Sequence, residues 1–488
     1  MSSAGVLESL PDIHCIKALA PGLHADGACA LCILRASQVP IGPAYLQPQA
    51  DIYQFFGIEQ PDSHTASPCS VCLSILSPDV FDQITQRYKE QGFDSSSVCI
   101  SIELPKSIYV RQRSMQIHAK NALVDLKDVL KYISGRRLAD ACSVSIDADS
   151  EMRVECAFSH QESSTDHQFL IDREGSSIRL KSFRKKGVDY TTGDSLGVVL
   201  AELEKCDDAT LEKCDDATVA SNFGSPPPLV KSFAEIESLV FKRASLFVGG
   251  RYLKLERNIS QTPFVVDGKR MTELSVSEVI GEPIKTLVHC DSYNLVGSGR
   301  EDADVRMLGD GRPFYIECIN PRITKVSQTQ LTQIESQLVQ ENSPVQCRLL
   351  QLIKPENTKI IKEGEENKTK HYCALVWLAT VLSKETLDEI NRLGSSEIEL
   401  QQNTPIRVLH RRSPLVRPRK LLRLEVTPVE GHFYRVRIES EAGTYIKEFV
   451  HGDLGRTSPS LSSMAGGIVA DILELDVENV SLDFPPKN

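Results

Sequence analysis

The pattern of apolar and polar positions indicates different organisation in the two halves of the chain. Between about residues 79 and 200, helix-like and strand-like stretches alternate, for example 81–91, 98–104 and 123–133. Alternation of a helical period with a two-residue period is typical of an α/β or α+β domain. We therefore expect a mixed domain in the first half, after a segment rich in Pro, Gln and Gly over 39–60.

The second half has shorter apolar runs separated by glycines. An apolar-periodic stretch over 233–247 ends at Gly249-Gly250. Two short strand-like runs, 305–308 and 313–319, flank Gly309-Asp310-Gly311, whose composition is typical of a tight turn. The pattern predicts a hairpin with these glycines at its tip.

Two further elements follow along the chain. Residues 323–339 have the pattern of a helix that stops near Pro344. Residues 434–439 alternate as in a strand, which would place Tyr434, Val436 and Ile438 on one face.

A repeat and a proline run indicate a linker in the middle of the chain. The segment LEKCDDAT over 203–210 is repeated without change over 211–218, and Ser-Pro-Pro-Pro follows at 225–228. One short tandem copy does not indicate a solenoid, and insertions are well tolerated in exposed loops. We expect four segments: a CxxC region over 1–78, a mixed domain over 79–200, a linker over 201–230 and a second domain over 231–488.

Composition and charge exclude several classes of protein. The chain of 488 residues is 41% hydrophobic and 25% charged, as expected for a globular protein of two or three domains. No apolar run approaches the roughly 18–20 residues that cross a bilayer, and residues 1–15 lack the basic start of a signal or transit peptide. We expect no membrane contact, and a cytoplasmic or nuclear location.

The net charge of −11 does not exclude nucleic acid, because phosphate contacts need only a local basic surface. Residues 403–424 contain no acidic residue, and 179–186 contain a second basic group. Each cluster could equally be a solvated face. The candidate RNA-binding residues of the first cluster are Arg407, Arg411, Arg412, Arg417, Arg419 and Lys420.

Four of the fourteen cysteines form two CxxC pairs, Cys29 with Cys32 and Cys69 with Cys72. Fourteen are too few for a secreted disulfide scaffold of this length. Four thiolates complete a closed tetrahedral Zn²⁺ site, which leaves no position for a reacting water. The pattern predicts one structural zinc ion and no catalytic cofactor.

Three segments of the second half could form an active site. Residues 299–306 (GREDADVR) are a charge-dense, glycine-flanked loop that precedes a strand. In 442–448 (AGTYIKE), Tyr445 and Lys447 would share a face if the strand over 434–439 continued, and would lie about 200° apart on a helix. Residues 370–374 (KHYCA) enter an apolar strand. Each segment could also have only a structural role.

These segments together resemble pseudouridine synthases. The sequence Gly-Arg-Glu-Asp at 299–302 resembles their G-R-x-D loop, 370–372 resembles the K-x-Y segment of the TruB-type enzymes, and 443–447 resembles their G-T-Y-I-R segment with Lys in place of Arg. The longer stretches 250–264, 299–314 and 442–461 are similar to the tenth pseudouridine synthase family of archaea and eukaryotes. Members of that family carry paired CxxC motifs and a THUMP RNA-binding domain in the N-terminal half.

The resemblance implies an α+β protein. Its C-terminal catalytic domain would have a mixed, mainly antiparallel sheet, and its N-terminal half would be a zinc-containing, THUMP-like domain. The family isomerises uridine to pseudouridine in tRNA, at position 54 or 55 of the TΨC arm. The implied partner is therefore tRNA, with other structured RNAs as further candidates, and we expect a monomer.

The resemblance also implies a role for each site residue. Asp302 would act on the ribose, as a nucleophile or as a base, with Asp304 as the rival carboxylate. Lys447 would keep Asp302 ionised. Tyr372 would stack on the uracil, which must be flipped out of the RNA. Tyr445 would pack under the site.

Arg300 would hold the catalytic loop or fill the gap left in the RNA stack. A second hypothesis is a zinc-containing RNA-binding or processing factor without catalysis, acting for example on small-RNA precursors. No Walker loop, HExxH or GxSxG motif is present, so kinase, zinc-protease and hydrolase functions have no support.

Overall fold

The computed structural model describes residues 3–10, 13–60, 67–169, 216–410 and 412–486. The chain divides into two compact units, Met1–Lys242 and Arg243–Asn488. The division falls after the expected domain start at residue 231, because the strand Glu235–Arg243 joins the sheet of the first unit. The basic group at 179–186 lies outside the described residues, as does the tandem repeat apart from residues 216–218.

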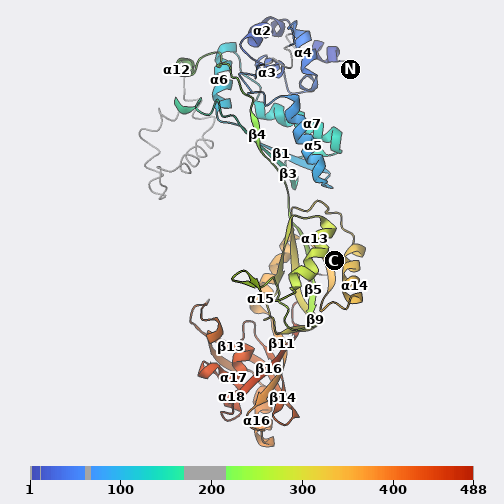
Figure 1. The fold of residues 1–488 in the computed structure, drawn as a ribbon, viewed down its shortest axis with the longest axis vertical. Coiled ribbons are helices and arrows are strands. Elements are labelled where there is room, and N and C mark those ends of the chain that lie inside the picture. The colour runs from blue at the N-terminus through green and yellow to red at the C-terminus, as the bar shows by residue number, and fades with distance from the viewer. Residues whose placement is uncertain (1–2, 11–12, 61–66, 170–215, 411, 487–488) are drawn as a thin grey trace. The chain divides into compact units, whose positions relative to one another are not determined.

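The first unit combines helices with a small sheet, in the strand order β2-β1-β3-β4 over the described residues. Strand β1 pairs in parallel with both β2 and β3. Helices α5 and α7 pack against each other, and α7 also contacts β1 (Figure 1). The helices are α1 (Ser3–Glu8), α2 (Ile13–Ala25), α3 (Ala30–Ala36), α4 (Gln49–Phe56), α5 (Pro78–Gln91), α6 (Ser107–Ala119), α7 (Leu126–Cys142) and α12 (Asp216–Asn222), and the strands are β1 (Ser97–Glu103), β2 (Ser145–Ile146), β3 (Met152–Ser159) and β4 (Glu235–Arg243).

The second unit is built on one large sheet, with ten strands among the described residues. The order is β10-β5-β9-β16-β11-β14-β13-β12-β15, and β8 also pairs with β9. The strands are β5 (Leu246–Lys254), β8 (Ser292–Gly297), β9 (Arg306–Ile319), β10 (Val345–Ile353), β11 (Lys370–Leu378), β12 (Ile398–Asn403), β13 (Val416–Glu430), β14 (Phe433–Ser440), β15 (Thr457–Ser458) and β16 (Ala470–Val480). All the pairings described for this sheet are antiparallel except β9 with β16, so the expected mixed, mainly antiparallel sheet is confirmed.

Helices cover the two halves of this sheet separately. Helices α13 (Val276–Val288) and α14 (Gln328–Gln340) pack on the half that contains β10, whereas α16 (Lys384–Gly394) packs on β13 and α17 (Ile446–His451) on β16 (Figure 1). The remaining helices are α15 (Thr358–Asn367) and α18 (Leu461–Met464).

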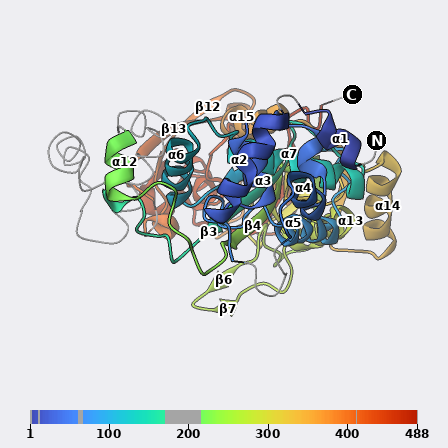
Figure 2. The ribbon, with the colours of Figure 1, turned by 90° about the horizontal axis from the view of Figure 1, so that it is seen from above.

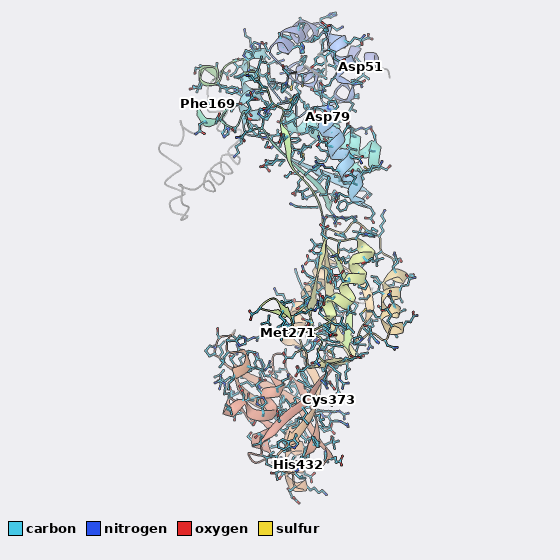
Figure 3. All side chains as sticks on the ribbon, in the orientation of Figure 1. Asp51, Asp79, Phe169, Met271, Cys373 and His432 are labelled. Carbon is cyan, nitrogen blue, oxygen red and sulfur yellow. The ribbon has the colours of Figure 1, made fainter. Side chains whose placement is uncertain are left out.

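The short strands β6 (Val265–Val266) and β7 (Lys269–Arg270) form a separate hairpin that projects from the second unit (Figure 2). The hairpin exposes Val265 and Val266, and Met271, labelled in Figure 3, is exposed directly after it.

The predicted hairpin around Gly309-Asp310-Gly311 is wrong, because these residues lie within the single strand β9. The register between β5 and β9 shifts at this point, and both glycines have positive φ. A Cβ at Gly309 would lie 1.8 Å from the backbone oxygen of Glu478, and one at Gly311 would lie 2.7 Å from that of Tyr252. The glycines therefore allow a bulge between close neighbouring strands, and do not reverse the chain.

Two other element boundaries differ from the prediction. Gly249-Gly250 does not end an element, because β5 continues through it to Lys254. The predicted helix over 323–339 begins only at Gln328, where Ser327 and Gln330 form a capping box that fixes its first turn. The expected alternation over 81–133 is present as α5, β1 and α7, with α6 inserted after β1.

In the part of the chain that the structure describes, no helix combines the length and the apolar character required to span a bilayer.

Candidate active site and metal centre

A cavity of about 580 Å³ opens in the second unit, and segments far apart in the sequence form its wall. It lies over the central strands, because the start of β11 and the C-terminal part of β16 contribute to it. Side chains around β11, where Cys373 is labelled, are drawn in Figure 3. The residues used below that line the cavity are Arg300, Glu301, Asp302, Arg312, Tyr372, Arg407, Arg412, Tyr445 and Lys447.

Asp302 lies in the loop between β8 and β9, and its side chain is 44% exposed at the cavity wall. Two cations from other segments reach the same carboxylate oxygen. Lys447 Nζ and Arg407 Nη1 each lie 3.3 Å from Asp302 Oδ2. The fold therefore places a carboxylate, a lysine and an arginine together at the cavity, although both cations are more than a hundred residues from Asp302 in the sequence.

Asp304 is the closer partner of Lys447, at 2.7 Å between Oδ2 and Nζ. Burial alone would raise the pKa of Asp304, but the hydrogen bond and the charge of Lys447 outweigh it, and the pKa is lowered from its ordinary value. Asp304 is not among the residues that line the cavity, whereas Asp302 is. Lys447 is thus shared between the two carboxylates, and Asp302 is the one that lines the cavity.

A buried network supports the loop that carries Asp302. The side chains of Glu301 and Arg312 are 1% and 2% exposed and form an ion pair of 2.8 Å. Tyr252 donates its hydroxyl hydrogen bond to Glu301 at 2.9 Å, and Gln261 donates to the carbonyl of Gly299 at 2.9 Å. Because every member of a buried polar network needs its partners, this arrangement fixes the backbone immediately before Asp302.

Lys254, at the end of β5, also supports the loop that carries Asp302. Its side chain is fully buried, and Nζ donates to the carbonyl oxygens of Ile259, Asp302 and Ala303 at 2.8, 3.0 and 3.2 Å. Burial lowers the pKa of Lys254 to about 8, and Glu301 is the largest opposing influence. No role for this lysine was predicted from the sequence, although it lies in the stretch 250–264 that resembles the family.

Tyr372 and Tyr445 both line the cavity, from different elements. Tyr372 lies near the start of β11, and burial raises the pKa of its hydroxyl group, an effect that Arg312 partly opposes. Tyr445 is the N-cap of α17, and its hydroxyl oxygen accepts a hydrogen bond from Arg412 at 3.2 Å.

The strand alternative for 442–448 is wrong, because β14 ends at Ser440 and α17 begins at Ile446. The backbone of Tyr445 is extended and Lys447 lies in the first helical turn, so both side chains still reach the cavity.

The basic residues predicted to bind RNA have different surroundings. Arg407 and Arg412 line the cavity, and Arg411 lies outside the described residues. On β13, Arg417 donates to the hydroxyl of Thr404 at 2.9 Å, Arg419 lies beside Gly443, and Lys420 pairs with Glu397 at 3.0 Å.

Arg300 also lines the cavity and is exposed. In the described part of the chain its guanidinium has no hydrogen bond or ion pair, so it remains available to a ligand.

The two CxxC pairs meet in the first unit, where the sulfurs of Cys29, Cys32, Cys69 and Cys72 all lie within 4.8 Å of one another. The backbone amides of Cys29 and Cys72 donate to Cys69 Sγ at 3.3 and 3.4 Å. Arg35, which is fully buried, donates to Cys32 Sγ at 3.4 Å. Such donors stabilise thiolates and orient them.

This donor set fits a tetrahedral metal ion. With metal–sulfur bonds of about 2.3 Å, neighbouring sulfurs of a tetrahedral zinc site are about 3.8 Å apart. Cys29 Sγ and Cys72 Sγ are 3.7 Å apart. Four sulfurs leave no open coordination position, so an ion held here would stabilise the fold of the first unit.

The comparisons with known proteins match both units. The family model described as "Pus10, C-terminal" matches residues 247–481, and the one described as "Eukaryotic Pus10, N-terminal" matches residues 69–239. The Homo sapiens "tRNA pseudouridine synthase Pus10" is 34% identical over 434 residues, which cover 86% of this chain and 79% of that protein. The Archaeoglobus fulgidus protein of the same name is 36% identical over 269 residues, or 52% of this chain and 72% of that protein.

Among solved structures, a Cbf5-Nop10-Gar1 complex gives a TM-score of 0.27 at 18% identity, over 47% of this chain and 48% of that chain. This likeness is too distant to support an argument, and the sequence matches decide the assignment. They place the chain among the pseudouridine synthases, which are isomerases. Within that class, the chain belongs to the Pus10 family.

Proposed function

We propose that this enzyme isomerises uridine to pseudouridine in tRNA, with Asp302 as the catalytic residue. The observation that carries the proposal is the Asp302 carboxylate at the cavity wall, 3.3 Å from each of two cations. The relatives named above are tRNA pseudouridine synthases. The cavity of about 580 Å³ lies within the usual size range of small-molecule sites and can accept one flipped nucleotide.

The chemistry begins when the target uridine leaves the RNA stack, at a cost of a few kcal/mol. Stacking on an aromatic ring contributes about 1–3 kcal/mol per base. Tyr372, which lines the cavity, would supply this ring. Asp302 then adds to C1′ of the ribose or removes the proton of C2′, and the glycosidic bond to N1 breaks. After the base has turned, C5 bonds to C1′ while the bond to Asp302 breaks or the proton returns to C2′. The proton of C5 then leaves, and N1 takes one up. Because Lys447 and Arg407 are already in place, their attraction for the carboxylate costs no reorganisation during the reaction.

The finer parts of the proposal concern the substrate and the first unit. We propose the TΨC arm as the target region, at uridine 54 or 55, and a zinc ion bound by the four clustered cysteines. The first unit, including a THUMP-like region, would hold the RNA and so select the uridine that enters the cavity. In this role the zinc ion stabilises the fold and takes no part in the reaction.

The test uses the purified full chain and an unmodified tRNA transcript. Pseudouridine is detected by carbodiimide labelling and primer extension, for the wild type, Asp302→Asn and the matched carboxylate variant Asp304→Asn. We expect product from the wild type and from Asp304→Asn, no product from Asp302→Asn, and nearly equal RNA affinity for all three.

Product from Asp302→Asn would refute the site assignment. No product from the wild type, with RNA binding retained, would instead support a non-catalytic RNA-binding or processing factor.

A further inference from the structure

Arg407 bridges two carboxylates at the edge of the cavity. It lies in a short 3-10 turn, Ile406–Val408, within the acid-free segment predicted to bind RNA phosphates. Its Nε donates to Glu448 Oε1 at 2.7 Å, and its Nη1 lies 3.3 Å from Asp302 Oδ2. The geometry therefore directs this guanidinium toward the proposed catalytic carboxylate.

Glu448 binds the Nε side of the Arg407 guanidinium. Its side chain is 3% exposed, in the first turn of α17, and the following Phe449 and Val450 are fully buried. Its second oxygen, Oε2, has no hydrogen-bond partner among the described residues. A buried carboxylate with so few partners depends strongly on its one cation. The side chain of Arg407 is 41% exposed, but its Nε is tied to this buried carboxylate on α17.

Lys447 constrains the orientation of Asp302 less than Arg407 does. Its ammonium is a point charge that lies closer to Asp304, at 2.7 Å, than to Asp302, at 3.3 Å. A guanidinium is planar and can keep two directed contacts at once. We propose that Arg407, anchored by Glu448, is a positioning residue that holds the Asp302 carboxylate in its reactive orientation, and that it is not a phosphate ligand. This inference rests on the proposed function of Asp302.

The two roles of Arg407 predict different kinetics. Loss of a phosphate contact weakens RNA binding and reduces its salt dependence. Loss of a positioning contact lowers the rate constant of the bound complex and leaves affinity unchanged. For Arg407→Gln we expect the single-turnover rate constant at saturating enzyme to fall by on the order of 10- to 100-fold, as for other small misplacements of a reacting group. The dissociation constant for tRNA should not change.

Two further variants and a rescue separate positioning from folding. Glu448→Gln should lower the same rate constant less, and its effect should not add to that of Arg407→Gln, because both act on one contact. Arg392→Gln removes an arginine from an exposed pair with Glu389 on α16 and is the matched control, with wild-type kinetics expected. In Arg407→Ala, ethylguanidinium should restore part of the rate, and tetramethylammonium at equal ionic strength should not.

The inference is overturned if Arg407→Gln weakens tRNA binding while its rate constant stays at the wild-type value. It is also overturned if the rate loss comes with a lower unfolding midpoint and ethylguanidinium gives no recovery, because the role is then structural. Absence of product from the wild type would be a separate result, since it refutes the proposed function itself.

Discussion

The buried Lys254 makes the stability of the second unit depend on pH in an unusual direction. In the folded chain its pKa is lowered from 10.5 to about 8 by burial, with three backbone carbonyls as its partners. Between these two values the unfolded chain binds the proton more strongly than the folded chain does. The free energy of unfolding therefore rises with pH across that window. Below pH 8, the destabilisation caused by burying the charged ammonium is fully present.

The size of the effect follows from the same two values. The gap between 10.5 and about 8 corresponds to about 3 kcal/mol, at about 1.4 kcal/mol for each pH unit. Lys254→Met removes the titrating group and leaves carbonyl oxygens without their donor. Each unsatisfied carbonyl costs about 1–3 kcal/mol of stability, and this loss does not depend on pH. The difference in free energy of unfolding, wild type minus Lys254→Met, should therefore increase by about 3 kcal/mol from pH 7.5 to pH 10.5.

Urea denaturation followed by tryptophan fluorescence measures this difference. Trp377 is the single tryptophan of the chain and lies on β11, so its signal reports the second unit. All other titrating groups are common to both proteins, and the effects of those that do not interact with Lys254 cancel in the difference. Lys359→Met is the matched control, because that lysine is exposed on α15 and lies in water in the folded and unfolded chains.

A difference between wild type and Lys254→Met that stays constant from pH 7.5 to 10.5 would refute the reasoning, and so would one that decreases. Either result would mean that the ammonium of Lys254 is not held in a low-dielectric position against the loop that carries Asp302.

Two further predictions concern the buried polar groups of each unit. Elemental analysis should find about one zinc per chain in the wild type and none in the double variant Cys29→Ser/Cys69→Ser, because a closed site needs all four ligands; a wild type that folds and acts without metal would contradict this. Arg312→Met leaves Glu301 buried and unpaired, so the free energy of unfolding measured through Trp377 should fall by about 3–5 kcal/mol. A loss below about 1 kcal/mol, the value typical of a surface pair, would show that the pair is solvated.

The sequence was informative wherever chemistry depends on residue type at short spacing. The two CxxC pairs could be recognised as ligands because a two-residue spacer lets one turn direct two sulfurs to one point. The loop at 299–302 and the segment at 443–447 could be recognised because they resemble known motifs. The cavity brings the side chains of both motifs together.

Elements with glycines were predicted less well. Glycines in a strand and glycines in a turn have the same local signature, so the pattern around Gly309 suggested a hairpin where the structure has a bulged strand. The close approach of the Glu478 backbone decides between them, and that contact joins residues far apart in the sequence.

The sequence by itself determined the residue types of both sites: two cysteine pairs in the first unit, and an aspartate loop, two tyrosines and a basic segment in the second. Only the tertiary structure decided their electrostatic partners. In the structure, Lys447 lies closer to Asp304 than to Asp302, and Arg407, an expected phosphate ligand, contacts Asp302. Lys254 donates hydrogen bonds to the backbone of the loop that carries Asp302. The physical reason is that Coulomb and hydrogen-bond energies depend on distances of a few ångströms between side chains. Strand order and helix packing set those distances between residues that are 48 to 143 positions apart in the sequence.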